Sequence, residues 1–289
     1  MKKLHGTGVA MVTPFDESGE IDFKSLKKIL THTAKGVDYY VVMGTTGEAA
    51  TVTQEEKKKV LTFVKENNTN NLPIVFGIGG NNTREVLETI AHTDLTGVEA
   101  VLSVSPYYTK PSQEGIVRHF LSVADASPLP IILYNVPART SSNLSAETTL
   151  RLAQHPKIIG VKEASGSLEQ CMRISKQKPD DFMLISGEDL LTVPMYAIGG
   201  VGVISVLANA LPVIFKAMKE YVLAGDYAKA SAEQFKILDI NGPMYEEGNP
   251  VGVKEVMAQM GICSPFVRLP LVPASTALKA KIKALRGKL

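Results

Sequence analysis

Apolar positions along this chain follow two alternating patterns. Short runs rich in valine and isoleucine are typical of buried strands, and longer segments with apolar residues every three or four positions predict amphipathic helices. Strands are expected at residues 8–13, 39–43, 73–76, 100–104, 131–134, 158–161, 183–186 and 201–206.

Helices are expected between these strands. The first spans 23–35, with Gly36 as its expected C-terminal cap, and the 53–56 segment forms a capping-box pattern that opens the second. The 82–85 segment opens a third helix, which Gly97 is expected to end. Further helices are predicted near 112–126, 145–154, 167–177 and 189–198.

This alternation predicts an α/β fold. Strands that are each followed by a helix form βαβ units and a parallel sheet, and eight of them close a (β/α)8 TIM barrel. A doubly wound open sheet is the alternative, because the number of strands is uncertain from sequence. After the eighth strand only helices are predicted, near 211–224, 226–240, 250–260 and 273–286. We therefore expect a barrel over residues 1–224 and a C-terminal helical extension over 225–289.

Composition narrows the class of protein. The 289 residues are 45% hydrophobic and 21% charged, as in ordinary globular proteins, and a net charge of +2 does not indicate nucleic-acid binding. Cys171 and Cys263 are too few for a disulfide framework. No signal peptide or membrane span is evident, so we expect a soluble cytoplasmic protein without nucleic-acid or membrane partners.

One strand carries a lysine where the apolar run ends. Lys162 follows the run 158–161, and loss of hydration disfavours the charged form of an amine, which makes it a candidate nucleophile for Schiff-base chemistry on a carbonyl. The alternative is a lysine that reaches solvent or pairs with Glu163. Because side chains alternate along a strand, we expect Glu163 to point to the other face.

Polar residues also follow the other strands. The turn 44–48 carries two threonines, 105–111 carries two tyrosines, and 134–140 begins with a tyrosine and contains an arginine. Each has an ordinary structural reading as a turn, a packing residue or a surface cation. In a barrel, however, the loops that follow the strands meet at one rim.

The combined residue types indicate a reaction class. The five histidines lack metal-ligand spacing, and neither a nucleophile-elbow serine nor a phosphate loop is present. The remaining groups are an amine, phenols, hydroxyls and a guanidinium. These are the functional groups that a Schiff-base lyase or aldolase acting on an α-keto acid uses.

The same motifs resemble a known family. Segments 44–48, 107–115, 134–140, 160–164 and 202–205 resemble those of the 4-hydroxy-tetrahydrodipicolinate synthases, formerly dihydrodipicolinate synthases, in the family's order and over nearly the whole chain. The resemblance implies a (β/α)8 barrel of the pyruvate-dependent aldolase superfamily. It also implies condensation of pyruvate with L-aspartate-4-semialdehyde, in lysine and diaminopimelate biosynthesis, without a cofactor or metal.

The resemblance also implies catalytic roles. Lys162 is expected to form the Schiff base with pyruvate, and Tyr134 to transfer protons during imine formation and cyclisation. Thr45 and Tyr108 are expected to complete a hydrogen-bonded proton relay with Tyr134. In the family, the tyrosine at the position of Tyr108 comes from the neighbouring subunit. A homo-oligomer is therefore implied, and we expect a tetramer built as a dimer of dimers.

The substrate-binding residues are implied in the same way. Thr46 is expected to hold the pyruvate carboxylate, and Arg139 the carboxylate of the semialdehyde, while Gly187 and Ile204 line the pocket. The alternatives are an N-acetylneuraminate lyase, a 2-keto-3-deoxy sugar acid aldolase, or a barrel that binds keto acids without turnover. The aldolases share the lysine but do not usually combine the tyrosine pair with an arginine placed as Arg139 is.

Two departures from the family pattern lead to expectations, one about feedback inhibition and one about the start of a helix. Ala49, Gln54 and Lys57 occupy positions where lysine-inhibited members have histidines and a serine, which predicts weak or absent feedback by L-lysine. Gly252 stands where a proline is expected and leaves the start of the helix near 250 in question.

Overall fold

The barrel is closed, with all strands parallel. The computed structural model describes residues 2–288, and its strands run in sequence order around the barrel, with β1 paired to β8. They are β1 (Gly6–Ala10), β2 (Tyr39–Val42), β3 (Ile74–Gly77), β4 (Ala100–Val104), β5 (Ile131–Asn135), β6 (Ile158–Glu163), β7 (Met183–Ser186) and β8 (Gly202–Ser205). The barrel prediction is confirmed, and the open-sheet alternative is wrong.

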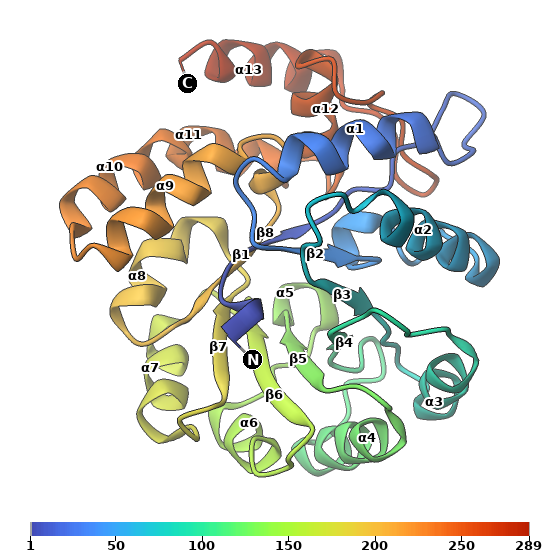
Figure 1. The fold of residues 1–289 in the computed structure, drawn as a ribbon, viewed down its shortest axis with the longest axis vertical. Helices are drawn as coiled ribbons and strands as arrows, with labels where there is room; N and C mark the ends of the chain where they lie inside the picture. The colour runs from blue at the N-terminus through green and yellow to red at the C-terminus, as the bar shows by residue number, and fades with distance from the viewer. Residues whose placement is uncertain (1, 289) are drawn as a thin grey trace.

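Eight helices surround the strands (Figure 1). They are α1 (Phe23–Thr33), α2 (Gln54–Asn67), α3 (Thr83–His92), α4 (Gln113–Ala126), α6 (Ala146–Leu152), α7 (Leu168–Gln177), α8 (Thr192–Ala197) and α9 (Pro212–Leu223). The predicted capping box is present, since Thr53 accepts from the backbone N–H of Glu56 and the Glu56 carboxylate accepts from that of Thr53. Such reciprocal bonds satisfy donors that a helix start leaves free.

Both glycines expected to end helices have other roles. Helix α1 ends at an Ala34 cap, and a Cβ on Gly36 would lie 2.2 Å from the carbonyl oxygen of Pro212, so the glycine allows close approach of the α9 start. Helix α3 is capped by Thr93, and Gly97 adopts φ +75° in the loop beyond it. Short helices at η2 (Thr45–Gly47) and α5 (Pro137–Thr140) were not predicted, and the helix predicted near 189–198 consists of η3 (Asp189–Leu191) and α8.

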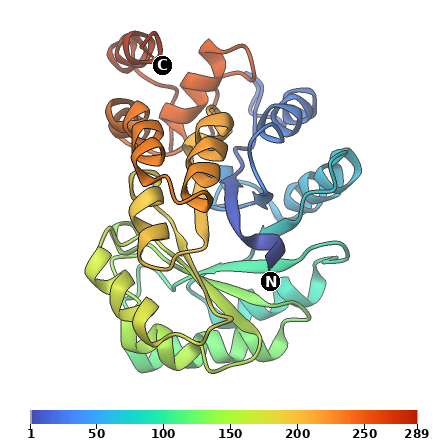
Figure 2. The ribbon, with the colours of Figure 1, turned by 60° about the vertical axis from the view of Figure 1, so that its left-hand side comes forward.

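The elements that follow α9 pack on one side of the barrel beside α1, α8 and α9 (Figure 2). They are α10 (Tyr227–Lys236), α11 (Leu238–Asn241), η5 (Gly242–Met244), α12 (Val251–Gln259) and α13 (Thr276–Arg286). Helix α12 begins at Val251 despite the missing proline. A Cβ on Gly252 would lie 2.4 Å from the carbonyl oxygen of Pro243, so the glycine lets α12 pack directly on η5.

Two apolar layers hold the barrel together. The larger lies between strands and helices and includes Leu26, Phe215 and Ile282, so residues far apart along the chain share one core. The smaller fills the barrel interior and includes Tyr134 and Ile204. Within residues 2–288, no helix is long and apolar enough to cross a membrane.

Candidate active site

Lys162 and Tyr134 face each other inside the barrel near the carboxyl ends of their strands. They are register partners on β6 and β5, and Nζ of Lys162 lies 4.4 Å from the centroid of the Tyr134 ring. The residues are only 5% and 7% exposed. The strand pattern therefore places an amine and a phenol side by side in a shielded position.

The Lys162 amine has no carboxylate partner. None of the ion pairs between residues 2 and 288 includes it, although Glu163 is its neighbour in sequence. Glu163 points outward, as predicted, and its carboxylate accepts from Asn135 at 3.0 Å and Gln170 at 2.9 Å. It also accepts from the backbone N–H of Ser165 at 2.8 Å. The proposed Lys162–Glu163 pair is therefore wrong, and the amine is not held in a salt bridge.

The threonine turn after β2 is held from several directions. Its residues form η2, and Thr13 donates from its hydroxyl to the carbonyl oxygen of Gly47 at 2.7 Å. Thr46 is 2% exposed, and its hydroxyl oxygen accepts from Nδ2 of Asn249 at 3.0 Å. Thr45 is half-buried. The turn thus presents two hydroxyls on a firmly anchored backbone.

Glu48, the last residue of that turn, belongs to a buried ion pair. Lys254 is 0% exposed and donates to the Glu48 carboxylate at 2.5 Å and to the carbonyl oxygen of Phe266 at 2.8 Å. The second Glu48 oxygen accepts from the backbone N–H of Arg268 at 3.0 Å. Burial lowers the pKa of Lys254, and the charge of Glu48 opposes that effect. Glu48 is therefore occupied in joining the turn to the C-terminal segment.

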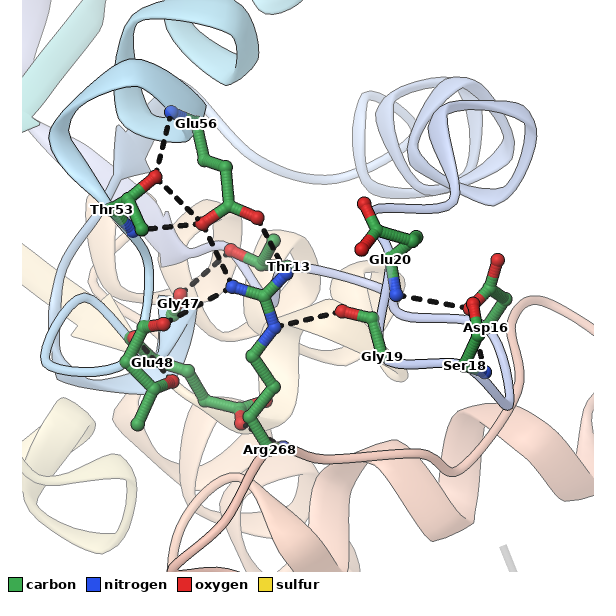
Figure 3. Close-up of polar contacts among 11 residues, drawn as sticks. Thr13, Asp16, Ser18, Gly19, Glu20, Gly47, Glu48, Thr53, Glu56 and Arg268 are labelled. Carbon is green, nitrogen blue, oxygen red and sulfur yellow. Dashed lines mark hydrogen bonds and ion pairs between the residues drawn. The ribbon is translucent and has the colours of Figure 1, made fainter.

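Arg268 extends this connection to α2 (Figure 3). Its guanidinium donates to both oxygens of Glu56, at 2.9 and 2.6 Å, and to the carbonyl oxygen of Gly19 at 2.8 Å. Hydrogen bonding from Arg268 lowers the pKa of Glu56 to about 2. The ring of Phe15 lies 4.3 Å from Nζ of Lys254 and 4.4 Å from Cζ of Arg268. Lys254 and Arg268 of the C-terminal segment thus both contact Phe15, which lies in the loop after β1.

The ends of β7 and β8 complete the rim. Gly187 donates its N–H to the carbonyl oxygen of Glu163 at 2.7 Å, and a Cβ there would lie 2.5 Å from that of Ala164, so no side chain fits. Ile204 is fully buried in β8. Glu188 is half-buried, and burial raises the pKa of its carboxyl group, with Lys162 acting in the opposite direction.

Two of the predicted residues lie at the surface. Tyr108 is 86% exposed with φ +71°, and Arg139 is exposed on α5. Among residues 2–288, no hydrogen bond joins Tyr108, Thr45 and Tyr134. A single chain therefore gathers Lys162 and Tyr134 but does not assemble the three-residue relay.

Sequence reasoning missed the contribution of the C-terminal segment. Asn249 precedes a proline and is typical of a turn, so nothing indicated that it contacts Thr46. Lys254 lies among Val251, Val253 and Val256, the same kind of apolar surroundings that singled out Lys162. That signal indicated burial in both cases, but it did not separate a paired lysine from an unpaired one.

A separate cavity lies away from Lys162. It has a volume of about 640 Å³ and is lined by residues that precede or begin β2, β3 and β4, at the opposite end of the barrel. Its charges are paired, since Lys3 contacts Glu99 at 2.8 Å and Asp38 binds Lys219 at 2.5 Å. Lys162 does not line this cavity.

Comparison with known proteins gives a consistent result. The family model described as "Dihydrodipicolinate synthetase family" matches residues 3–287. A 4-hydroxy-tetrahydrodipicolinate synthase of Cytophaga hutchinsonii is 46% identical, over 100% of this chain and 98% of that protein. The dihydrodipicolinate synthase of Acinetobacter baumannii, solved with pyruvate, superposes with a TM-score of 0.95 at 35% identity, over 99% of this chain and 98% of that one. A monomeric dihydrodipicolinate synthase variant also superposes at 0.95, with 33% identity, over 99% and 97% of the two chains.

Proposed function

Because this chain belongs to the dihydrodipicolinate synthetase family, we propose that it condenses pyruvate with L-aspartate-4-semialdehyde through a Schiff base on Lys162. The observation that carries this proposal is the buried Lys162 amine, which lies 4.4 Å from the Tyr134 ring and has no ion-pair partner among residues 2–288. The product is 4-hydroxy-tetrahydrodipicolinate, and one water molecule is released.

The first half of the reaction activates pyruvate. The neutral Lys162 amine adds to the ketone carbon, and the carbinolamine loses water to give an imine. The Tyr134 ring lies 4.4 Å from the amine, and its phenol is the group we assign to supply the proton that the departing hydroxyl needs. The imine then acidifies the pyruvate methyl group, and loss of a proton from that carbon gives an enamine.

The second half forms the ring. The enamine carbon attacks the aldehyde carbon of the semialdehyde, and the aldehyde oxygen takes a proton to become the 4-hydroxyl group. The amino group of the semialdehyde then attacks the imine carbon, and the bond from that carbon to Lys162 breaks. Ring closure therefore regenerates the free lysine, and no cofactor is needed to balance the atoms.

The rim residues provide binding groups for both carboxylates. Thr46 has a hydroxyl proton available for the pyruvate carboxylate, and an arginine fork such as that of Arg139 matches a carboxylate bidentately. Gly187 brings the backbone after β7 close to the end of β6, because a Cβ there would lie only 2.5 Å from that of Ala164. Ile204 adds an apolar side chain to the barrel interior, in the same buried cluster as Tyr134.

Tyr108 is assigned to the active site of a second copy. Its exposed phenol and left-handed backbone project the ring away from its own barrel, which fits donation across an interface. We expect a homotetramer of two dimers, with activity that falls when the dimer is diluted below its dissociation constant. Analytical ultracentrifugation in parallel with the assay tests this.

Borohydride reduction tests the lysine assignment. Incubation with pyruvate and borohydride should add the mass of a reduced pyruvate adduct to the peptide containing Lys162 and abolish activity. Lys157, on the loop before the same strand and bonded to the carbonyl oxygen of Ser127, provides an internal control and should remain unmodified. An active enzyme with unmodified Lys162 would rule out this mechanism. A parallel assay with N-acetylneuraminate and 2-keto-3-deoxy sugar acids tests the aldolase alternatives.

A further inference from the structure

A residue of the C-terminal segment contacts the proposed pyruvate site. Asn249 lies between η5 and α12, and its Nδ2 donates to the hydroxyl oxygen of Thr46, 203 positions away, at 3.0 Å. The two residues are 7% and 2% exposed. This hydrogen bond is therefore shielded from water, which strengthens its electrostatic component.

We propose that Asn249 is a positioning residue that fixes the Thr46 hydroxyl as a hydrogen-bond donor to the pyruvate carboxylate. This inference rests on the proposed function. A threonine hydroxyl has one proton and two lone pairs, and the amide N–H of Asn249 occupies one lone pair. The hydroxyl proton has no acceptor among the described residues. A carboxylate, which only accepts, is the complementary group for that proton.

The same segment prevents the turn from moving. Asn249 is followed by the N-terminal cap of α12, and Lys254 within that helix binds Glu48. Thr46 and Glu48 are two positions apart, so the turn is attached at both residues to one short piece of chain. Thr13 holds the carbonyl oxygen of Gly47 between them. Asn249 thus acts from a fixed position relative to Thr46.

The chemistry at position 249 requires an amide. An aspartate would occupy the same volume, but it would accept the Thr46 proton and remove it from the substrate. It would also place a negative charge close to the pyruvate carboxylate. The Asn249→Asp variant therefore reverses the hydrogen bond, whereas Asn249→Ala only removes it. A role limited to filling space predicts the opposite order, with aspartate better tolerated than alanine.

Borohydride trapping at increasing pyruvate concentration measures this effect directly. We expect the pyruvate concentration for half-maximal trapping to rise about tenfold in Asn249→Ala, and further in Asn249→Asp, with a smaller change in kcat. Asn241→Ala is the matched control, because it removes another carboxamide of the C-terminal segment, whose Oδ1 is buried and has no hydrogen-bond partner among residues 2–288. Its half-saturation should equal that of wild type.

A double-variant cycle separates positioning from a general structural effect. If Asn249 acts through Thr46, adding Asn249→Ala to Thr46→Val should change half-saturation less than twofold. The proposal would be overturned if the effects of the two substitutions on half-saturation multiplied in the double variant. It would also be overturned if Asn249→Asp trapped pyruvate as wild type does. If Asn249→Ala does not fold, the half-saturation of the isosteric Asn249→Asp variant can still be compared with that of wild type. Failure of wild type to trap pyruvate would refute the proposed function instead.

Discussion

Lys254 and Glu48 form an ion pair at 2.5 Å in the interior, although 206 positions separate them in sequence. Their side chains are 0% and 2% exposed, so each charge depends on the other for compensation. The pair joins α12 to the turn that carries Thr45 and Thr46. Its contribution to stability and its contribution to the site can therefore be measured separately.

Removing one partner of this pair should be strongly destabilising. We expect Lys254→Met to lower the free energy of unfolding by about 3–5 kcal/mol, because Glu48 is left buried and uncompensated. The double variant Lys254→Met with Glu48→Leu should recover much of that loss, measured by denaturant titration. Lys219→Met, which breaks a partly exposed pair with Asp38, is the control and should lower stability less. If Lys254→Met and Lys219→Met lowered the free energy of unfolding equally, burial of the Lys254–Glu48 pair would not explain its effect.

The Glu56–Arg268 pair predicts acid sensitivity. Because hydrogen bonding from Arg268 lowers the pKa of Glu56 from 4.5 to about 2, the pair stabilises the fold fully above pH 4.5 and loses that effect as pH falls towards 2. We expect Glu56→Gln to reduce stability at pH 7 by about 1 kcal/mol or less and to make the protein less sensitive to acid in this window. Glu88→Gln, which disrupts an exposed pair with Arg84, should leave the pH profile unchanged. Parallel unfolding curves at pH 7, 4 and 3 provide the measurement.

His119 should affect stability at milder pH. Burial lowers its pKa from 6.5 to about 4, and its Nδ1 lies 2.9 Å from the hydroxyl of Thr83. Between pH 6.5 and 4 the unfolded chain therefore binds a proton that the folded chain excludes, so stability falls as pH falls through this window. From pH 7 to 5 the loss should be about 1–2 kcal/mol smaller in His119→Gln than in wild type. The exposed His92→Gln variant should retain the wild-type slope.

Feedback by L-lysine should be weak or absent. Ala49, Gln54 and Lys57 replace the histidines and serine expected in lysine-inhibited members, and a cation at position 57 repels the ammonium groups of lysine. Partial burial lowers the pKa of Lys57, and neither Ala49 nor Gln54 carries a hydroxyl or an imidazole. Initial rates should therefore stay above half of the control at millimolar L-lysine. Halving of the rate in that range would refute the prediction, and Lys57→Ala with stronger inhibition would support the charge argument.

The barrel could be predicted from sequence because its signals are local. Each strand is a short apolar run, and the capping box at 53–56 is a four-residue pattern that sets the start of α2. The rim of the barrel followed from those elements, since a residue at the end of β6 must lie beside the end of β5. The sequence pattern therefore predicts that Lys162 and Tyr134 lie at the same rim of the barrel.

The attachment of the C-terminal segment could not be predicted in this way. Asn249, Lys254 and Arg268 lie more than 200 positions from their partners, and neither spacing nor periodicity links them to the turn they contact. Gly36 and Gly252 show a related limit, because a neighbouring backbone from another element, and not the local turn, explains why a side chain is excluded. Long-range packing is the common cause of both failures.

Arg139 provides a test that separates the two substrates. It is exposed on α5, directly after the strand that carries Tyr134, where its guanidinium can meet the carboxylate of the semialdehyde. We expect Arg139→Ala to raise the KM for the semialdehyde at least tenfold, because a charge-assisted bidentate contact is lost, while half-saturation for pyruvate trapping stays unchanged. Arg139→Lys should recover only part of the loss, since an ammonium group cannot bind both oxygens as a fork. Arg151→Ala, which removes an exposed arginine paired with Glu114, is the control and should leave both parameters at wild-type values. Weakened pyruvate trapping in Arg139→Ala would show instead that the arginine serves the first substrate, and its assignment to the semialdehyde would be wrong.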